Sequence, residues 1–203
     1  GNSYVVTTIS KGKNRLLIAD LSGNSASLKK EIVVDGVDAF NNPEWSPDGE
    51  KILLNGLVDG QSDLYVYYLN SGKVEQLTDD RYSDLQASWS DDGEKIVFIS
   101  ERGPNTHLDQ QIYGNYRLCT LDLETQKVNV LDVFPQTDVF SPNFSGQDTS
   151  IYFLSHADGK RNLYEYKIKE DKVFRLTDFV TGISGITDLA PAYSISRETG
   201  KVV

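Results

Sequence analysis

A short aromatic pattern recurs four times along the 203-residue chain. In each copy a serine follows an aromatic residue, at positions 45, 89, 144 and 193, so successive copies are separated by 44, 55 and 49 residues. The four copies are Pro43-Glu44-Trp45-Ser46, Ala87-Ser88-Trp89-Ser90, Pro142-Asn143-Phe144-Ser145 and Pro191-Ala192-Tyr193-Ser194. Periods of about 40–50 residues are typical of propeller blades, so this repeat constrains the fold more than any other feature.

Each repeat continues with a turn and an apolar run. The first two copies lead through Asp-Gly-Glu-Lys into residues 52–54 and 96–99, whereas the third has a looser turn at 146–148 before residues 151–154. Asp-Gly between two apolar runs is a strong hairpin signal, because both residues tolerate a positive φ. The pattern therefore predicts a first and a second antiparallel strand in each unit.

Two further strands follow in each unit. Runs rich in Tyr, Val, Ile and Leu occupy residues 64–69, 116–123 and 163–168, and shorter ones occupy 74–78, 128–133 and 173–177. Strand-forming residues dominate these runs, and no segment has a 3.6-residue apolar period. The sequence predicts an all-β chain, a β-propeller of four-stranded antiparallel blades. The recurring aromatic residues are expected to fill the interfaces between blades.

The two ends of the chain carry incomplete units. Residues 4–9, 15–21 and 28–34 form three expected strands with no aromatic first strand before them, and residues 191–203 hold a first strand and the start of a second. We therefore expect blades at approximately 1–36, 37–80, 81–134 and 135–179, with a partial blade at 180–203. The visible chain would then hold about four blades and part of a fifth.

The residues PEWSPDGEKILL and SDLYVYYLNSGKVEQLT closely resemble the TolB-type propeller repeat, whose pattern is P-x-W-S-P-D-G-x-x-I followed by D-L-Y and L-T. ASWSDDGEKIVFIS matches nearly as well, and the third unit retains NLYEYKI and FRLT. The family commonly closes with six blades, so the resemblance implies part of a six-bladed ring, a four- or five-bladed ring being the alternative. It also implies a periplasmic, cell-surface or secreted location in a bacterial envelope.

Composition excludes some partners. The net charge of −10 and the pI near 4.6 argue against nucleic acid, because like charges repel. No apolar run approaches the roughly 18 residues that would span a bilayer. Cys119 is the only cysteine, so no internal disulfide can form. No charged and apolar leader is visible, and the lack of methionine suggests that an N-terminal region has been removed.

Loop lengths point to one face of the propeller. With strands A to D in each blade, the A–B and C–D turns are short and alike, whereas the B–C connection at 101–115 and the D–A connection at 178–190 are long and lie on the opposite face. Binding residues concentrate on loops held by a rigid scaffold, although long loops are also tolerated as insertions. The candidate residues for a protein or glycan partner are Arg102, His107, Tyr113, Phe179, Ile183 and Asp188.

Signals for a cofactor or for catalysis are weak. Aspartates gather on the same face, at 35, 38, 79, 80, 84, 132, 138, 178 and 188, and such a ring could hold Ca²⁺, but no D-x-D-x-D-G loop is present and strand-end aspartates usually serve turns. His107 and His156, the only histidines, lack zinc-site spacing. The sequence Gly182-Ile183-Ser184-Gly185 is not a nucleophile elbow. We therefore predict no cofactor and no catalytic residues.

Three functions remain open. The first is a non-catalytic propeller that binds a protein or glycan in the bacterial envelope. The second is the propeller domain of a larger envelope peptidase or prolyl-oligopeptidase-like hydrolase, whose catalytic domain lies outside this chain. The third, a propeller lyase acting on acidic sugars, fits poorly, because that chemistry uses histidine-bound metal and basic residues, and this acidic chain has two histidines.

Overall fold

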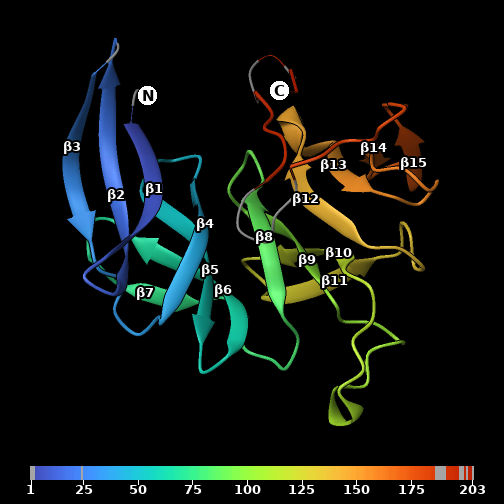
Figure 1. Ribbon diagram of the computed structural model, residues 1–203, viewed down its shortest axis with the longest axis horizontal. Helices are drawn as coiled ribbons and strands as arrows, with labels where there is room; N and C mark the ends of the chain where they lie inside the picture. Colours follow the sequence, from blue (N-terminus) through green and yellow to red (C-terminus); the bar gives the residue numbers. More distant parts are fainter. Residues whose placement is uncertain (1–2, 24, 186–190, 197–198, 200, 203) are drawn as a thin grey trace.

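A computed structural model describes residues 3–23, 25–185, 191–196, 199 and 201–202. The strands form four antiparallel sheets set side by side around a common centre (Figure 1). The first sheet contains β1 (Ser3–Ser10), β2 (Lys13–Ser22) and β3 (Ser25–Ile32). The second contains β4 (Ala39–Trp45), β5 (Lys51–Val58), β6 (Gln61–Tyr68) and β7 (Val74–Gln76). The predicted all-β architecture of propeller blades is confirmed.

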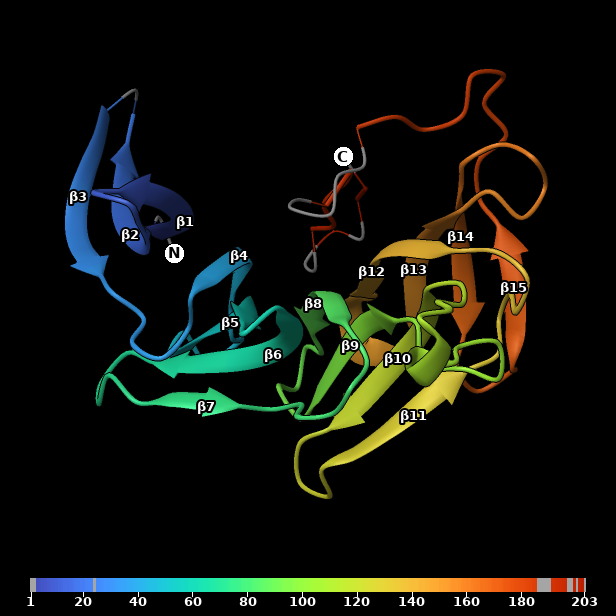
Figure 2. The same ribbon diagram turned by 60° about the horizontal axis from the view of Figure 1, so that its bottom comes forward.

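The other two sheets repeat the arrangement of the second. They contain β8 (Asp84–Trp89), β9 (Lys95–Ser100), β10 (Arg117–Asp122) and β11 (Lys127–Leu131), then β12 (Val139–Phe144), β13 (Ser150–Ser155), β14 (Asn162–Lys167) and β15 (Lys172–Arg175). In all three, consecutive strands are hydrogen-bonded neighbours. The first strands β4, β8 and β12 lie toward the middle of the molecule and the last strands β7, β11 and β15 lie at its periphery (Figures 1 and 2). Helical structure is limited to two short 3₁₀ turns, η1 (Leu108–Gln110) and η2 (Gly146–Asp148), within the described residues.

The Ser-x-Asp-Gly sequence builds the turn between the first two strands of a blade. The amide of Lys51 donates to Ser46 Oγ at 2.9 Å, the amide of Gly49 donates to the carbonyl of Ser46, and Gly49 has a φ of +72°. Ser90 and Gly93 repeat these contacts in the next blade. In these two turns only the glycine of the Asp-Gly pair takes a positive φ, so glycine is the residue that this turn requires.

A side-chain clasp joins the last two strands and explains the Asp-Leu-Tyr and Leu-Thr parts of the repeat. Thr78 Oγ1 accepts the amide of Leu64 at 3.0 Å and donates to Asp63 at 3.3 Å. The fourth sheet replaces the aspartate with Asn162, which pairs with Thr177 at 3.1 Å. The third sheet has an Arg117–Asp132 ion pair (2.5 Å) at the equivalent place. Three sheets of this chain therefore make a side-chain contact at the same place, each with a different pair of residue types.

The recurring aromatic residues fill the spaces between sheets, as predicted. Trp89 is 1% exposed and belongs to a core cluster with Leu53 and Leu64 of the preceding sheet. Phe144 is buried in the next cluster, and Tyr193 in a smaller one. Trp45 is only partly buried. Neither face of such a small sheet is covered by its own strands, so stacking supplies the core.

One strand prediction needs correction. The inner strands begin at residues 39, 84 and 139, shortly after the predicted blade starts, and each contains a bulge that lets pairing continue past an irregular point. The described part of 191–203 contains one antiparallel bridge, Ile195 with Val202, rather than the two strands expected. The first strand of a blade is stabilised by a ladder of backbone hydrogen bonds to the second strand. A single bridge supplies few of these hydrogen bonds.

Candidate functional site

The inner strands carry strained backbone at equivalent positions. Asn42, Gln86 and Ser141 have φ values of 53°, 51° and 49°, a left-handed conformation that non-glycine residues seldom adopt. Each lies at the bulge of its strand, between the two shifted registers. Each left-handed residue costs of the order of 1 kcal/mol or more and persists only when the surrounding structure holds it. Because three of them occupy matching places, the left-handed conformation is part of the repeat.

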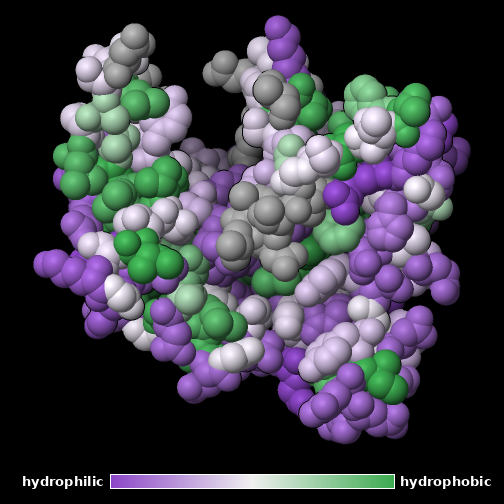
Figure 3. Space-filling model, in the orientation of Figure 1, coloured by the Kyte–Doolittle hydropathy of each residue, from purple (hydrophilic) through white to green (hydrophobic). Residues whose placement is uncertain are grey.

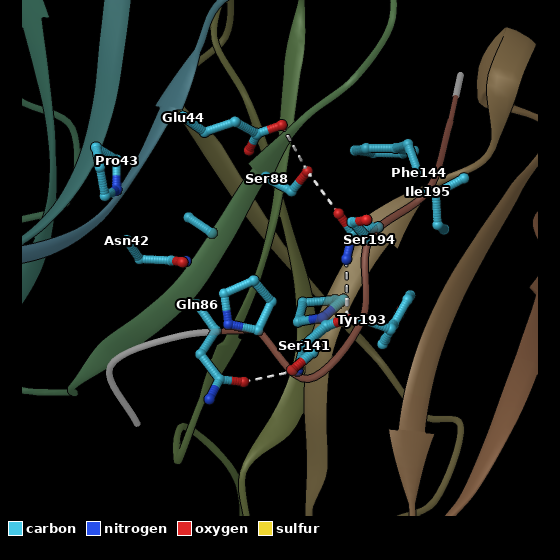
Figure 4. Close-up of a pocket in the computed structure, with 14 residues that line it drawn as sticks. Asn42, Pro43, Glu44, Gln86, Ser88, Ser141, Phe144, Tyr193, Ser194 and Ile195 are labelled. Atoms are coloured by element: carbon cyan, nitrogen blue, oxygen red, sulfur yellow. Dashed lines mark hydrogen bonds between the residues drawn. The ribbon is translucent and has the colours of Figure 1, made fainter. Parts of the chain in front are cut away.

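These bulges line a small pocket at the centre of the blades, with a volume of about 220 Å³ (Figure 4). Ser88 Oγ lies 3.1 Å from Glu44 Oε1 and 3.3 Å from Asn143 Oδ1, so polar side chains of three inner strands meet. The amide of Ser141 donates to Gln86 Oε1 at 2.6 Å. The pocket's polar groups thus bind one another and hold neighbouring inner strands at a fixed spacing. Sequence analysis missed this role, although the residue before each aromatic was visible in the repeat.

The long B–C connection projects from the third sheet. It is the yellow-green segment containing η1 that extends farthest downward in Figure 1. His107 and Ile112 close it with a two-residue bridge, and Thr106 at its base accepts the amide of Gly114 at 3.0 Å. The loop is therefore an ordered hairpin-like excursion, anchored at its base.

The returning arm of this loop is solvent-exposed. Tyr113 is 68% exposed and Ile112 is 46% exposed, and Figure 3 shows a hydrophobic spot surrounded by hydrophilic residues at the end of the projection. His107 is also exposed. A hollow of about 440 Å³ separates the loop from residues 80–82, and its lining includes His107 and Tyr82. Of the predicted binding residues, His107 and Tyr113 are both exposed in this loop, and His107 also lines the hollow.

Arg102 occupies a different environment. Its side chain is 11% exposed and its guanidinium lies 2.6 Å from Asp84, which is fully buried, and 3.0 Å from Asp80. The guanidinium also lies over the rings of Tyr82 and Phe98, at 5.4 and 5.7 Å from their centroids. Sequence analysis grouped Arg102 with the binding residues, but here it anchors the base of the loop.

Two carboxyl groups in and beside this anchor have raised pKa values. Burial raises the pKa of Asp84 to about 6, although Arg102 acts in the opposite direction. Burial and then the charge of Asp84 raise the pKa of Asp63 to about 6. Asp63 belongs to the second sheet and Asp84 to the third, so the network joins two blades. Arg102 thus pairs with Asp84 and Asp80, whereas Asp63 lies close enough to Asp84 for the two carboxylates to repel each other.

The predicted acidic ring is dispersed into local contacts. Asp132 pairs with Arg117, Asp138 accepts the amide of Tyr116 at 2.8 Å, and Asp178 lies 3.5 Å from Arg175. No group of three His, Cys, Asp or Glu residues with metal-binding geometry occurs in the part of the chain that the structure describes. The aspartates act mainly as turn and ion-pair partners, the alternative noted for strand ends.

The long D–A connection lies against the B–C turn of its own blade. The amide of Ile183 donates to the carbonyl of Arg161 at 2.7 Å. Phe179 is 54% exposed, whereas Ile183 is partly buried against the cluster around Tyr193. Asp188 lies outside the described residues. The structure therefore presents Phe179 to solvent and uses Ile183 in packing.

Residues suited to nucleophilic chemistry are not assembled among the described side chains. Cys119 is fully buried in β10, and burial raises the pKa of its thiol to about 12. His156 is exposed and stacks on Phe140, with ring centroids 6.4 Å apart. A thiol that stays protonated at neutral pH is a poor nucleophile.

None of the described helices is long and apolar enough to cross a membrane.

The fold defines a class of protein: an all-β chain of propeller blades, in which consecutive strands of each antiparallel sheet are neighbours. The family model of the TolB beta propeller domain matches residues 2–117, more than half of the chain. The chain belongs to this TolB β-propeller family. The resemblance noted in the sequence is therefore confirmed.

Individual relatives fall into two groups. The chain is 30% identical over 161 residues to the Tol-Pal system protein TolB of Wolinella succinogenes, covering 76% of this chain and 34% of the relative. It is 27% identical over 151 residues to dipeptidyl-peptidase 5 of Porphyromonas gingivalis, covering 70% of this chain and 21% of the relative. The chain thus spans about a third or less of the length of these relatives.

Solved structures agree on the fold. The crystal structure of TolB from Acinetobacter baumannii superposes with a TM-score of 0.69 and 20% identity, over 98% of this chain and 45% of that chain. At this identity the likeness establishes the architecture alone. Similar blades thus occur both in TolB and in a peptidase.

Proposed function

We propose that these blades form a non-catalytic recognition module that binds a protein partner in the bacterial envelope through the B–C and D–A loop face. The observation that carries the proposal is the projecting loop at 101–116, whose Ile112 and Tyr113 are exposed although the loop's base is firmly held. Exposed apolar and aromatic side chains on a rigidly held loop are typical of interface residues. The TolB relatives support a periplasmic or cell-surface location.

The architecture supports this assignment energetically. Arg102 and Thr106 fix the base of the loop, so the loop loses little conformational freedom when it binds. Tyrosine offers a large, amphipathic contact surface with few rotatable bonds. The partner need not be basic, because Arg81 and Asp109 neutralise each other beside the hollow, at 2.8 Å.

Site-specific photo-crosslinking tests the proposal. A benzophenone amino acid replaces Tyr113 in one version of the protein and Lys169 in another, since Lys169 is exposed in a C–D turn on the opposite face. After irradiation in the native envelope, position 113 should yield a discrete protein adduct that mass spectrometry identifies. Position 169 should not. Equal adducts at both positions, or none at 113, would contradict the loop-face assignment.

A second candidate is the propeller domain of a larger peptidase, favoured by the similarity to dipeptidyl-peptidase 5. In that case a catalytic domain would cover the propeller, and the crosslink from Tyr113 would join two parts of one polypeptide. Peptide mapping of the adduct separates an intramolecular from an intermolecular product. Hydrolysis of dipeptidyl-4-nitroanilides by the native protein, but not by residues 1–203 alone, would support the peptidase domain.

A further inference from the structure

Among the arginines that the structure describes, Arg161 stands out by its lack of an ion pair. Six of the arginines lie in the described residues, and in this chain of net charge −10 five of them have a carboxylate within 4 Å. The five pairs are Arg15 with Glu31, Arg81 with Asp109, Arg102 with Asp84, Arg117 with Asp132 and Arg175 with Asp158. Arg161 has no such partner among the described side chains, and its Nε is buried without a hydrogen-bond acceptor. The Nε of Arg15 is also buried without an acceptor, but Arg15 has an ion pair with Glu31, so the unpaired charge is what distinguishes Arg161.

The backbone at Arg161 is held in place from two sides. The residue ends the B–C turn before β14, and its carbonyl accepts the amide of Ile183 from the D–A connection. Gly182 has a φ of +70°, and a Cβ there would lie 3.1 Å from the Arg161 nitrogen and 3.2 Å from its oxygen. Glycine therefore permits this close approach, and the two loops form one support.

The side chain is positioned on an aromatic surface. Its guanidinium carbon lies 5.5 Å from the centre of the Phe140 ring, and that ring stacks with the exposed imidazole of His156. Arg161 itself is partly exposed, so part of the guanidinium is accessible. A cation fixed over an apolar ring is partly desolvated, which strengthens its interaction with an anion.

The surrounding charges favour an anion. Lys160, the neighbouring residue, is exposed, and no ion pair involves it among the described side chains. Asp158 of the same turn forms an ion pair with Arg175 at 2.5 Å, and this contact lowers the pKa of Asp158 to about 2. The turn from 156 to 161 therefore carries a local excess of positive charge in an acidic protein.

We propose that Arg161, with Phe140 and His156 beside it, binds a carboxylate of the protein partner. The planar guanidinium matches a carboxylate with two parallel hydrogen bonds, and the imidazole can donate a further one. The inference deepens the proposed function, because it names the group that the loop face recognises. A C-terminal carboxylate and an acidic side chain offer the same chemistry.

The test observes the Arg161 Nε–H signal by NMR of the ¹⁵N-labelled protein during titration with three acetylated peptides. The probes are acetyl-trialanine with a free carboxylate, its C-terminal amide, and the amidated peptide acetyl-Ala-Asp-Ala. The free acid, the aspartyl peptide or both should shift the signal with a saturable curve, and the plain amide should bind at least tenfold more weakly. The better of the two carboxylate probes identifies the source.

Variants keep the proposal falsifiable. Because these variants lack the Arg161 Nε–H, their binding is followed by the backbone amide signal of Ile183, which donates to the carbonyl of residue 161. Arg161→Gln should abolish the saturable shift, Arg161→Lys should weaken binding several-fold because the planar fork is lost, and the control Arg81→Gln should leave binding unchanged. Equal shifts with the plain amide, or binding of inorganic phosphate in preference to both carboxylates, would overturn the proposal. The outcome is independent of the crosslink at Tyr113, so failure of the subsite and failure of the loop-face assignment can be told apart.

Discussion

The Arg102 anchor gives the sharpest stability prediction. Replacing Arg102 by methionine keeps most of the side-chain volume but leaves Asp84, which has no exposed surface, without its cation. Breaking a buried pair by removing one partner costs about 3–5 kcal/mol. We therefore expect Arg102→Met to lower the free energy of unfolding by about that amount at pH 7.5.

The pH dependence of this loss follows from the two carboxylates. The folded-state pKa values of Asp63 and Asp84, about 6, lie above the unfolded value of 3.8, so the folded protein binds more protons than the unfolded chain between these limits. The cost of the two buried charges is therefore present above pH 6 and disappears as the pH falls toward 4. Without Arg102 the pKa of Asp84 rises further. The destabilisation by Arg102→Met should thus shrink markedly between pH 7.5 and pH 5.

Urea unfolding curves at both pH values measure the effect. Arg81→Met is the matched control, because the Arg81 and Asp109 side chains are 67% and 87% exposed, and loss of such a surface pair costs roughly 0–1 kcal/mol. Similar losses for the two variants, or a loss by Arg102→Met that grows as the pH falls, would refute the assignment of Arg102 as the partner of a buried carboxylate.

Two further predictions concern the cores between blades. Trp89→Ala should destabilise the protein by about 3–5 kcal/mol, whereas Trp45→Ala should cost clearly less, since Trp45 is only partly buried; calorimetric melting of both variants compares them directly, and equal losses would contradict the packing described. Cys119 should resist Ellman's reagent at pH 8 in the folded protein and react fully in 6 M guanidinium, because burial keeps the thiol protonated and inaccessible; rapid labelling of the folded protein would contradict this.

Much of the blade could be predicted from local sequence. The turn at Ser46 to Gly49 was recognisable because a positive φ restricts the residue that can occupy that position. The burial of Trp89 was predictable because a small sheet has no other means of covering its faces. The turn depends on local backbone conformation and the burial depends on the repeat. Both can be recognised from residues close together in the sequence.

The candidate site was only partly predictable. Loop length drew attention to the connection that presents Tyr113, but it gave no indication that Arg102 turns inward to meet Asp84. The contribution of Arg161 was not anticipated either. Its partners, Phe140 and Ile183, lie about 20 residues away in opposite directions along the chain, and no local pattern links them.

The sequence alone determined that this chain is a series of β-propeller blades, because strand periodicity, turn glycines and the spacing of large rings are local properties repeated along it. The tertiary structure decided which charged groups are consumed internally and which remain available. Arg102 and Arg161 both lie in connections between the second and third strands of a blade, but one meets a buried carboxylate and the other lies over an aromatic ring without a carboxylate partner among the described side chains. That difference arises from side chains brought together across blades and loops, where distance in space is independent of distance along the chain.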